Sequence, residues 1–423
     1  MNFEPTKDFA KAQDHADPLK EYRSQFVIDD PGLIYLDGNS LGRLPEATGR
    51  RLDQIITKEW GKELINGWNQ GWWEAPAHVG DKLASLVGAG PGQVIVCDST
   101  SVNLFKLTSA ALKLKPGRSK IITDTLNFPS DLYILQGLVD LLGNRHKIIR
   151  IGSPDDGITP DLGALEASIN QETALVTLSH VVFKSGYLYD MARITHRAHQ
   201  AGALVLWDLS HSVGALPIEL DACGVDFAIG CTYKYLNGGP GSPAFLYVNQ
   251  VLQDKARSPI WGWVGQEAPF AFDLEYSPAP GMDRFQAGTP AVLSLLAMEA
   301  SLEILLSAGI ENLREKSIQL TEYLLYLLET RLSGLGFRLG SPHNPERRGS
   351  HISLRHPEGY RINRVLVEEM GVIPDFREPD NIRFGFAPLY TTFSEVWEAV
   401  ERMQTVVSEK RYKNYPQQRL PVT

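Results

Sequence analysis

Short apolar runs alternate with longer amphipathic segments through the first two thirds of the chain. The runs include "QVIVCD", "SKIIT", "TALVTLS", "ALVLWD" and "AFLYV", and segments of helical pattern such as "SVNLFKLTSAALKL" and "DMARITHRAHQAG" follow some of them. The runs carry Val, Ile, Leu and Ala without a polar face, which is typical of strands covered on both sides. The pattern therefore predicts an α/β fold with a buried, mostly parallel sheet flanked by helices.

The pattern changes after about Pro290. Two long helices are predicted there by "AVLSLLAMEASLEILLSAG" and "IENLREKSIQLTEYLLYLLETRLSGLG", followed by short strands such as "HISLR" and "NIRFGFA" and a last helix from Thr392. A chain of 423 residues exceeds the size that one hydrophobic core usually serves. We therefore expect a smaller α+β domain after the large α/β domain.

Composition narrows the classes of function. The chain has 41 basic and 50 acidic side chains, a net charge of −9, which argues against a nucleic-acid partner bound through a broad basic face. Its cysteines, Cys97, Cys223 and Cys231, have no CxxC spacing, so neither a disulfide framework nor a zinc site is predicted. No stretch resembles a signal peptide or approaches the roughly 20 apolar residues of a membrane span. We expect a cytoplasmic protein without a membrane partner.

The segment "CTYKYLNGGPG" places Lys234 between two tyrosines, directly after an apolar run. A single lysine is most often a solvated surface residue, and that interpretation is the simpler one here. Asp208 ends the run "ALVLWD" and His211 follows three residues later, where a helix cap and a structural histidine are the simpler interpretations. Because ligands of such sheets bind beyond the carboxyl ends of the strands, Lys234 and Asp208 could reach one cleft.

Two further strand ends carry polar or aromatic side chains. "VCDSTSVNLF" puts Ser99, Thr100 and Ser101 at a strand-to-helix junction, which suits either a phosphate or a simple N-cap. "LNFPSDLY" puts Phe128 before Asp131, which alone would be a core residue and a cap. A lysine amine, a carboxylate, an aromatic face and a phosphate cradle are together what pyridoxal 5′-phosphate requires.

The motifs also resemble a known family, the kynureninases, which are fold-type-I pyridoxal phosphate hydrolases related to the class V aminotransferases. The resemblance rests on "YLDGNSLGRLP", "NGWNQGWW", "NFPSDLY", "WDLSHSVGALP", "CTYKYLNGGPG", "GWVG", "QAGTP" and "RFGFAPLYTTFSEVWEAV". It runs from about residue 20 to the end. It implies an N-terminal arm at 1–60 packed with the small domain, a large cofactor-binding domain at 61–290 and a small C-terminal domain at 291–423.

The resemblance assigns roles residue by residue. Lys234 matches the lysine that bonds to the cofactor aldehyde, Asp208 the partner of the ring nitrogen, and Tyr233 is the candidate for moving protons late in the reaction. The other implied cofactor contacts are Thr100, Ser101, Phe128, Pro129, Ser130, Asp131, Ser179, His211, Trp263 and Thr289. The implied substrate contacts are Ser40, Trp68, Gly288 and Arg383. Arg383 matches the arginine that grips the substrate α-carboxylate, and no metal is implied.

The implied activity is hydrolysis of L-kynurenine to anthranilate and L-alanine. The family acts in tryptophan catabolism by the kynurenine pathway, which also serves NAD biosynthesis. In the family Trp263 and Thr289 reach the site of the neighbouring subunit, so a homodimer with shared active sites is implied. Trp68 with the segment 287–289 looks like the bacterial pattern, which favours kynurenine over 3-hydroxykynurenine. The freed Lys234 amine would remove the α-proton while the cofactor ring takes up the electrons.

Three alternatives share some of these features. A cysteine desulfurase requires a nucleophilic thiol on a later loop, but no cysteine follows Cys231. A class V aminotransferase would exchange keto acids, whereas a kynureninase would release alanine with anthranilate. A non-catalytic binding protein would be expected to have lost Lys234 or Asp208, and both are present.

Overall fold

The large domain is built around a mostly parallel sheet. In the computed structural model, which describes residues 2–418, this sheet has seven strands in the order β2-β8-β7-β6-β5-β3-β4, and only β8 runs against its neighbours. The strands are β2 (Val94–Val96), β3 (Lys120–Asp124), β4 (Lys147–Ile151), β5 (Thr173–Ser179), β6 (Leu204–Asp208), β7 (Phe227–Gly230) and β8 (Phe245–Val248). Every residue of β5, β6, β7 and β8 is buried, so the prediction of buried strands is confirmed.

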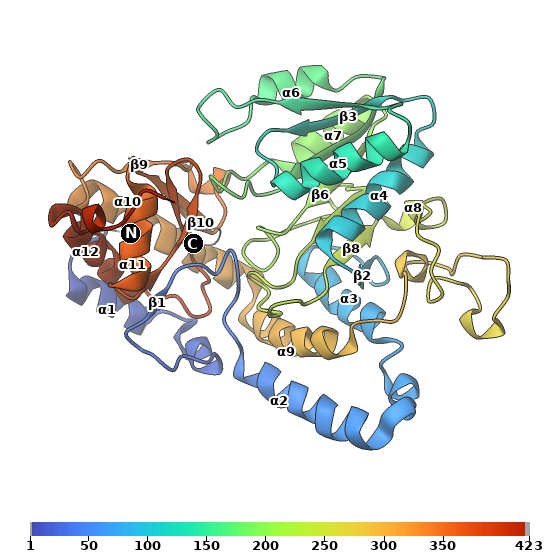
Figure 1. Cartoon of the computed structure of the whole chain (residues 1–423), viewed down its shortest axis with the longest axis horizontal. Coiled ribbons are helices and arrows are strands. Elements are labelled where there is room, and N and C mark those ends of the chain that lie inside the picture. The colour runs from blue at the N-terminus through green and yellow to red at the C-terminus, as the bar shows by residue number, and fades with distance from the viewer. Residues whose placement is uncertain (1, 419–423) are drawn as a thin grey trace.

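Helices cover both faces of this sheet (Figure 1). They are α3 (Ala75–Leu86), α4 (Thr100–Leu114), α5 (Pro129–Leu141), α6 (Leu162–Ser168), α7 (Met191–Gln200) and α9 (Val292–Ala308). Side chains alternate between the faces along a strand. On β6, Val205 and Trp207 belong to the core that includes side chains of α3, α7 and α9, whereas Leu204 and Leu206 belong to the core on the α4 side. Both faces are thus apolar, as the continuous runs predicted.

The small domain has an antiparallel sheet, which in the described part of the chain has four strands in the order β12-β13-β10-β9. These strands are β9 (Arg338–Leu339), β10 (His351–Arg355), β12 (Asp375–Arg377) and β13 (Asn381–Gly385). The main helices are α10 (Ile310–Arg331), α11 (Gly359–Glu368) and α12 (Phe393–Ser408). A capping box of Thr392 and Glu395 starts α12, at the residue where the sequence predicted the last helix.

The N-terminal segment packs against the small domain. Helix α1 (Lys7–Ala16) contacts α12, and the Asp14 carboxylate accepts backbone N–H groups of Phe393 and Ser394 at the start of α12, at 2.6 and 3.1 Å. Strand β1 (Ile34–Tyr35) pairs in parallel with β11 (Val372–Ile373). Helix α1 and strand β1 are therefore attached to the C-terminal part of the chain, whereas Leu19 and Phe26 between them pack into the large-domain core.

The chain between these parts returns to the large domain. Helix α2 (Glu46–Gln54) packs on α9, and the short helical segments after it are η2 (Ile55–Glu63) and η3 (Leu64–Gln70). Helix α9 lies beyond residue 290 but its side chains belong to the large-domain core, whereas α10 supplies Leu320 and Leu324 to the small-domain core. The predicted domain bounds stay a prediction, and residues 419–423 of the last domain lie outside the described residues.

None of the helices in residues 2–418 combines the length and the apolar composition required to cross a membrane by itself. Helices α9 and α10 meet that requirement only when taken together, and they are bent by 80° at the break between them. The apolar side chains of α9 pack in the protein core, where Leu295, Met298 and Leu302 are almost wholly buried.

Candidate active site

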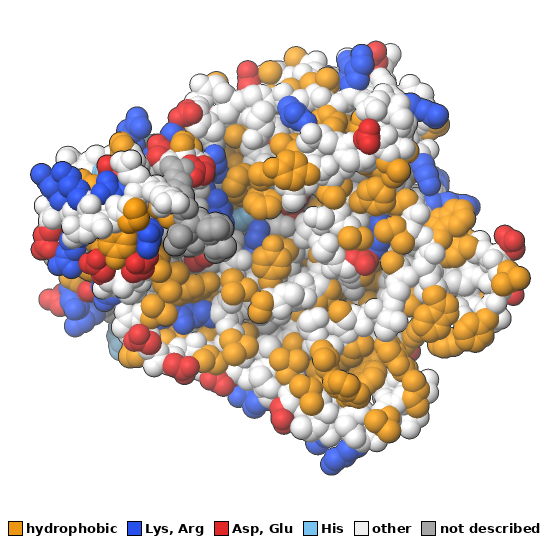
Figure 2. Space-filling view, in the orientation of Figure 1, with side chains coloured by type: hydrophobic (Ala, Val, Ile, Leu, Met, Phe, Trp, Pro, Cys, Tyr) orange, Lys and Arg blue, Asp and Glu red, His pale blue; other side chains and the backbone are white. Residues whose placement is uncertain are grey.

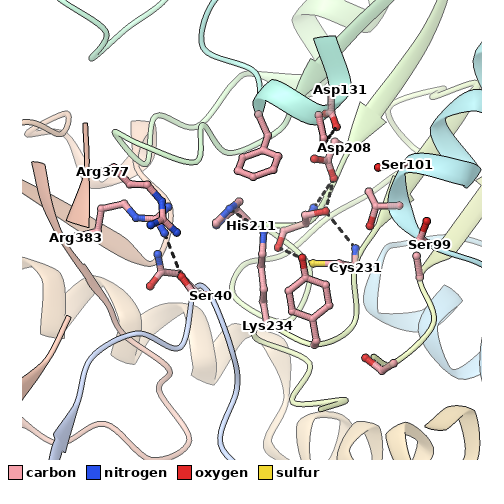
Figure 3. Close-up of a pocket in the computed structure, with 18 residues that line it drawn as sticks. Ser40, Ser99, Ser101, Asp131, Asp208, His211, Cys231, Lys234, Arg377 and Arg383 are labelled. Carbon is pink, nitrogen blue, oxygen red and sulfur yellow. Dashed lines mark hydrogen bonds between the residues drawn. The ribbon is translucent and has the colours of Figure 1, made fainter. Parts of the chain in front are cut away.

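A cavity of about 380 Å³ lies where the ends of the large-domain strands face the small-domain sheet (Figure 3). It brings together eleven of the residues predicted from the sequence, namely Ser40, Thr100, Ser101, Phe128, Ser130, Asp131, Asp208, His211, Tyr233, Lys234 and Arg383. The remaining lining residues are Asn39, Ser99, Ser210, Cys231, Ser242, Ala244 and Arg377. The N-terminal segment, the large domain and the small domain all contribute to this one cavity.

Lys234 stands on the loop after β7 and is half-buried. Its Nζ lies 2.9 Å from Nε2 of His211 and 5.8 Å from the centre of the Tyr233 ring. Burial and the neighbouring Lys234 charge hold the pKa of His211 well below its usual value, so this imidazole is neutral and can accept a hydrogen bond from the lysine. The lysine is therefore held by a neutral acceptor and not by a carboxylate.

The backbone around Lys234 is fixed by close packing. Gly42 donates its N–H to the Tyr233 carbonyl at 2.8 Å, and a Cβ at Gly42 would lie only 2.4 Å from the Lys234 carbonyl oxygen. On the other side, Asn237 has a φ of 55° and Gly239 a φ of 85°, which form the tight turn that follows the lysine. The glycines of "SLGRLP" and "LNGGPG" thus hold the lysine loop in place.

Two buried carboxylates lie opposite the lysine. Asp208 ends β6, and its Oδ1 accepts both the N–H and the hydroxyl of Ser210, at 2.8 and 2.6 Å. Burial raises the pKa of Asp208, and burial together with the Asp208 charge raises the pKa of Asp131 well above its usual value. Burial disfavours the negative charge of both carboxylates. A cationic N–H placed beside them would therefore stabilise their ionised forms.

The start of α4 forms one wall of the cavity. Ser99 is the N-cap, and its hydroxyl accepts the N–H of Val102 at 3.4 Å. Thr100 and Ser101 are the first helical residues, and both line the cavity. Backbone N–H groups in a first helical turn have no partner within the helix, and with the helix dipole they favour an anion. The cap and the phosphate cradle are therefore compatible interpretations of the same segment.

Phe128 offers an aromatic face to the cavity. It precedes Pro129, the first residue of α5, and 43% of its surface is exposed although it is apolar. Its ring meets Phe183 edge-on, with ring centres 5.2 Å apart. That contact holds the ring in place while one face remains available for stacking against a flat ligand.

Arg383 is almost wholly buried on β13, where it pairs with a carboxylate. Its Nε donates to Oδ1 of Asp375 at 2.6 Å, its Nη2 donates to Oδ2 of Asp375 and, at 3.1 Å, to Ser40, and its Nη1 donates to the Phe183 carbonyl. Arg383 therefore makes a structural ion pair with Asp375, and it still lines the cavity.

Arg377 is a cavity residue that the sequence interpretation missed. Its Nη2 lies 2.8 Å from Oδ2 of Asp375, so two arginines share one carboxylate. Although burial opposes ionisation, the charges of Arg383 and Arg377 lower the pKa of Asp375, which stays negative. The cluster therefore presents net positive charge to the cavity. The signal was available, because "DFR" puts Asp375 and Arg377 on one face of a strand.

The other predicted residues lie outside this cavity. Ser179 ends β5 beside Asp208, and Pro129 starts α5. Trp68 and Thr289 line a separate apolar groove of about 500 Å³ together with Trp60, Trp72 and residues 290–294. Trp263 is 44% exposed and Gly288 has no atom within 4 Å of a Cβ built on it. In a single chain Trp68, Thr289, Trp263 and Gly288 lie outside the Lys234 cavity.

The residues of the cavity fit pyridoxal phosphate. Asp208 offers a carboxylate to a ring N–H, the start of α4 offers donors to a phosphate, Phe128 offers a stacking face and Lys234 offers an amine. Within residues 2–418, no cluster of three or more His, Cys, Asp or Glu side chains is placed to hold a metal ion. The arrangement supports chemistry at an amino group next to a carboxylate.

Comparison with known proteins identifies the family. Residues 313–403 match the family model of the kynureninase C-terminal domain. Along 412 residues the chain is 44% identical to a kynureninase of Pseudomonas fluorescens, covering 96% of this chain and 97% of that one. It is 43% identical over 413 residues to a kynureninase of Burkholderia pseudomallei strain 1106a, with the same two coverages.

Solved structures confirm the fold. A cysteine desulfurase from Thermococcus onnurineus NA1 superposes with a TM-score of 0.77 at 20% identity, covering 92% of this chain and 98% of that one. The cysteine desulfurase CsdA from Escherichia coli gives 0.77 at 19% identity, covering 94% and 98%. These similarities show the predicted fold-type-I architecture alone, whereas the relatives above match nearly the full length. The chain therefore belongs to the kynureninase family.

Proposed function

We propose that this protein hydrolyses L-kynurenine to anthranilate and L-alanine, a step of tryptophan catabolism, with pyridoxal phosphate as its cofactor. The observation that carries the proposal is that Lys234 of the large domain and Arg383 of the small domain line one cavity in a member of the kynureninase family. An amine and a carboxylate receptor on opposite walls are what an α-amino acid substrate requires.

The residues that would hold the cofactor come from three elements, namely β6, α4 and α5. Asp208 would pair with the ring N–H, the first turn of α4 would bind the phosphate, and Phe128 would stack on the ring. Ser130 and Asp131 at the start of α5 would contribute polar contacts from the same side. When bound, pyridoxal phosphate supplies an aldehyde that bonds to amines and a ring that accepts electrons from the substrate.

The two arginines would orient the substrate. Arg383 is held rigidly by Asp375, Ser40 and the Phe183 carbonyl, so its guanidinium loses little freedom when a carboxylate arrives. Arg377 adds a second positive charge, and its side chain is 34% exposed. A carboxylate fixed at this end directs the α-hydrogen of the amino acid toward Lys234 on the opposite wall.

Lys234 and Tyr233 would handle the protons. The Lys234 amine is the base for the α-hydrogen, and the neutral His211 beside it can accept a hydrogen bond without competing as a charged acid. Burial raises the pKa of Tyr233, so its phenol remains protonated and can donate a proton or a hydrogen bond to an oxygen in the cavity. Tyr233 is thus our candidate donor when water is added to the ketone.

The proposal includes a homodimer with shared sites. Exposed aromatic and aliphatic side chains gather in two patches on one face of the molecule (Figure 2). The exposed large hydrophobic residues from the segments on either side of the groove are Ile56, Trp60, Leu64, Ile65, Trp261, Trp263, Phe270, Phe272, Leu274 and Leu293. Exposed apolar patches of this kind mark a protein interface. A second copy docked there would bring Trp68, Trp263, Gly288 and Thr289 toward the partner's cavity.

Anthranilate fluorescence tests the activity directly. Purified protein loaded with pyridoxal phosphate should convert L-kynurenine to equal amounts of anthranilate and alanine. Formation of the amine form of the cofactor with a keto acid would instead favour an aminotransferase. No turnover of either kind by fully loaded protein would overturn the proposal. The same assay with 3-hydroxykynurenine tests the expected preference for kynurenine, and cell fractionation tests the cytoplasmic location, which stays a prediction.

A further inference from the structure

His351 is a buried polar residue without an evident structural task. It is the first residue of β10 and has no exposed surface, yet within residues 2–418 neither of its ring nitrogens makes a hydrogen bond of regular geometry, and only the Phe183 backbone is close enough to act on its pKa as a hydrogen-bond partner. A buried donor or acceptor that is left unpaired destabilises a fold, so such groups are rare unless they serve a function. Gly186, with a φ of 73°, packs against this ring, and a Cβ there would lie 3.4 Å from its Nε2.

The ring of His351 faces His211. The two ring centres are 5.4 Å apart with a tilt of 54°, and Nδ1 of His211 is likewise buried without a partner. The other nitrogen of His211, Nε2, lies 2.9 Å from Nζ of Lys234. Lys234, His211 and His351 therefore form a line that begins at the amine in the large domain and ends on a strand of the small domain.

The donor and acceptor roles of imidazole nitrogens decide how the protons are placed along these three residues. A neutral imidazole has one donor nitrogen and one acceptor nitrogen, and the hydrogen bond made by one nitrogen decides the role of the other. When Lys234 donates to Nε2 of His211, the proton of His211 must be on Nδ1, where it requires an acceptor. A ring nitrogen of His351 is a nearby group able to accept it once the two rings, whose centres are 5.4 Å apart, close the gap that leaves both nitrogens unpaired. Burial lowers the pKa of His351 to about 3, so that ring is neutral and keeps an acceptor nitrogen.

We propose that His351 is a positioning residue that hydrogen-bonds Nδ1 of His211, fixes its tautomer and so keeps Nε2 directed at Lys234. The inference rests on the proposed function, since it assigns a task toward the lysine that acts as base. It also links the two ends of the cavity. On the β10–β13 pair, His351 lies two residues from Ser353, the register partner of Arg383. The strand pair that receives the substrate carboxylate therefore also carries the group that orients His211.

The test compares two variants at this position with a matched control. His351→Leu removes both nitrogens, whereas His351→Gln keeps one donor and one acceptor. His356→Leu is the control, because His356 is also a buried histidine of the small domain but bonds the Leu335 carbonyl and the Glu358 N–H. We expect His351→Leu to lower kcat by about 10-fold to 100-fold, as substitutions behind a catalytic group commonly do, with KM for kynurenine changed less than threefold. His351→Gln should recover most of the loss.

A second readout does not depend on turnover. The rate at which apoenzyme takes up pyridoxal phosphate, followed by absorbance, reports the availability of the Lys234 amine and should fall in His351→Leu but not in His356→Leu. Should His351→Leu not fold, His351→Met replaces it. Unchanged uptake and kcat in the apolar variant would overturn the inference, and so would a loss that His351→Gln does not recover. If wild-type protein takes up the cofactor but forms no anthranilate, the proposed function fails, while the uptake rates still decide the role of His351.

Discussion

The Lys234 cavity and the tryptophan groove are opposite kinds of surface. The cavity is lined mostly by polar side chains, and within one chain its Lys234 bonds His211 while its two arginines share the Asp375 carboxylate. The groove is lined by Trp60, Trp68, Trp72 and residues 289–294, and 55% of Trp60 is exposed to solvent. The cavity can be explained by contacts inside the chain, whereas the groove leaves apolar surface in water.

This difference shows which of the two sites one chain can form without a second copy. In the cavity the lysine, the carboxylates and the arginines all come from one chain, so its chemistry follows from residues that one chain provides. In the groove Trp68 and Thr289, which were predicted to contact substrate and cofactor, lie outside the Lys234 cavity, so they gain a role only if a second chain uses them. Substitutions should therefore separate into those that act within a chain and those that act across chains.

Loss of the lysine should have the largest effect and should act within the chain. Lys234→Ala removes the base and the amine that bonds to the cofactor, so kcat should fall by at least about 10²–10⁴-fold. The absorbance band of the cofactor bound to the lysine should disappear as well. Lys113→Ala, an exposed lysine at the end of α4, is the control and should behave like wild type. Steady turnover by Lys234→Ala would break the assignment of the cavity.

Arg383→Lys should have the next largest effect. The lysine keeps the charge but cannot reproduce the fork that bonds Asp375, Ser40 and a substrate carboxylate, so the expected loss is about 1.5–3 kcal/mol of binding, or roughly 10-fold to 150-fold in kcat/KM. The resting absorbance of the cofactor should not change. Arg377→Lys should cost less, because Arg377 is more exposed. A disturbed resting spectrum with normal kynurenine kinetics would make Arg383 purely structural.

Subunit mixing tests the groove. Trp263→Ala should lower kcat/KM by about tenfold if its side chain supports the partner's cofactor phosphate. Mixing this variant with Lys234→Ala should then restore about a quarter of wild-type activity, because half of the dimers would carry one intact site. Trp261→Ala, another exposed tryptophan, is the control for Trp263→Ala. Activity that stays at the average of the two separate variants would mean that the sites are not shared.

Much of the cavity could be predicted because its residues stand at strand ends. Asp208 ends β6 and Ser99 caps α4, and an apolar run that stops at a polar residue marks such an end in the sequence itself. The alternation of runs predicted the parallel sheet for the same reason, since strands buried on both faces show no period of two. Local patterns were sufficient wherever the function depends on a strand end.

Other residues could not be found that way because their task depends on pairing between distant segments. Asp375 and His351 meet the cavity only through the register of β10, β12 and β13, and no local pattern fixes that register. Local patterns also do not show which domain core a helix joins. Helix α9 follows the change of pattern near Pro290, yet it packs on α2 and α3 because its apolar surface fits the large-domain core.

The last predicted effect is a dependence of the free energy of unfolding on pH. It concerns the cavity side of the molecule, because the tryptophans of the groove do not titrate. Burial and the nearby Asp375 charge raise the pKa of Asp37 to about 7. The folded protein then binds a proton more tightly than the unfolded chain, so this group lowers the free energy of unfolding as pH rises from about 4 to about 7. Asp37→Asn cannot ionise, and its stability relative to wild type should increase by about 2–3 kcal/mol between pH 5 and pH 8 in urea unfolding. Asp29→Asn, an exposed position, should show no such trend. A constant difference between Asp37→Asn and wild type over this range would show that Asp37 is already ionised at pH 5 and that the arginine cluster stabilises it.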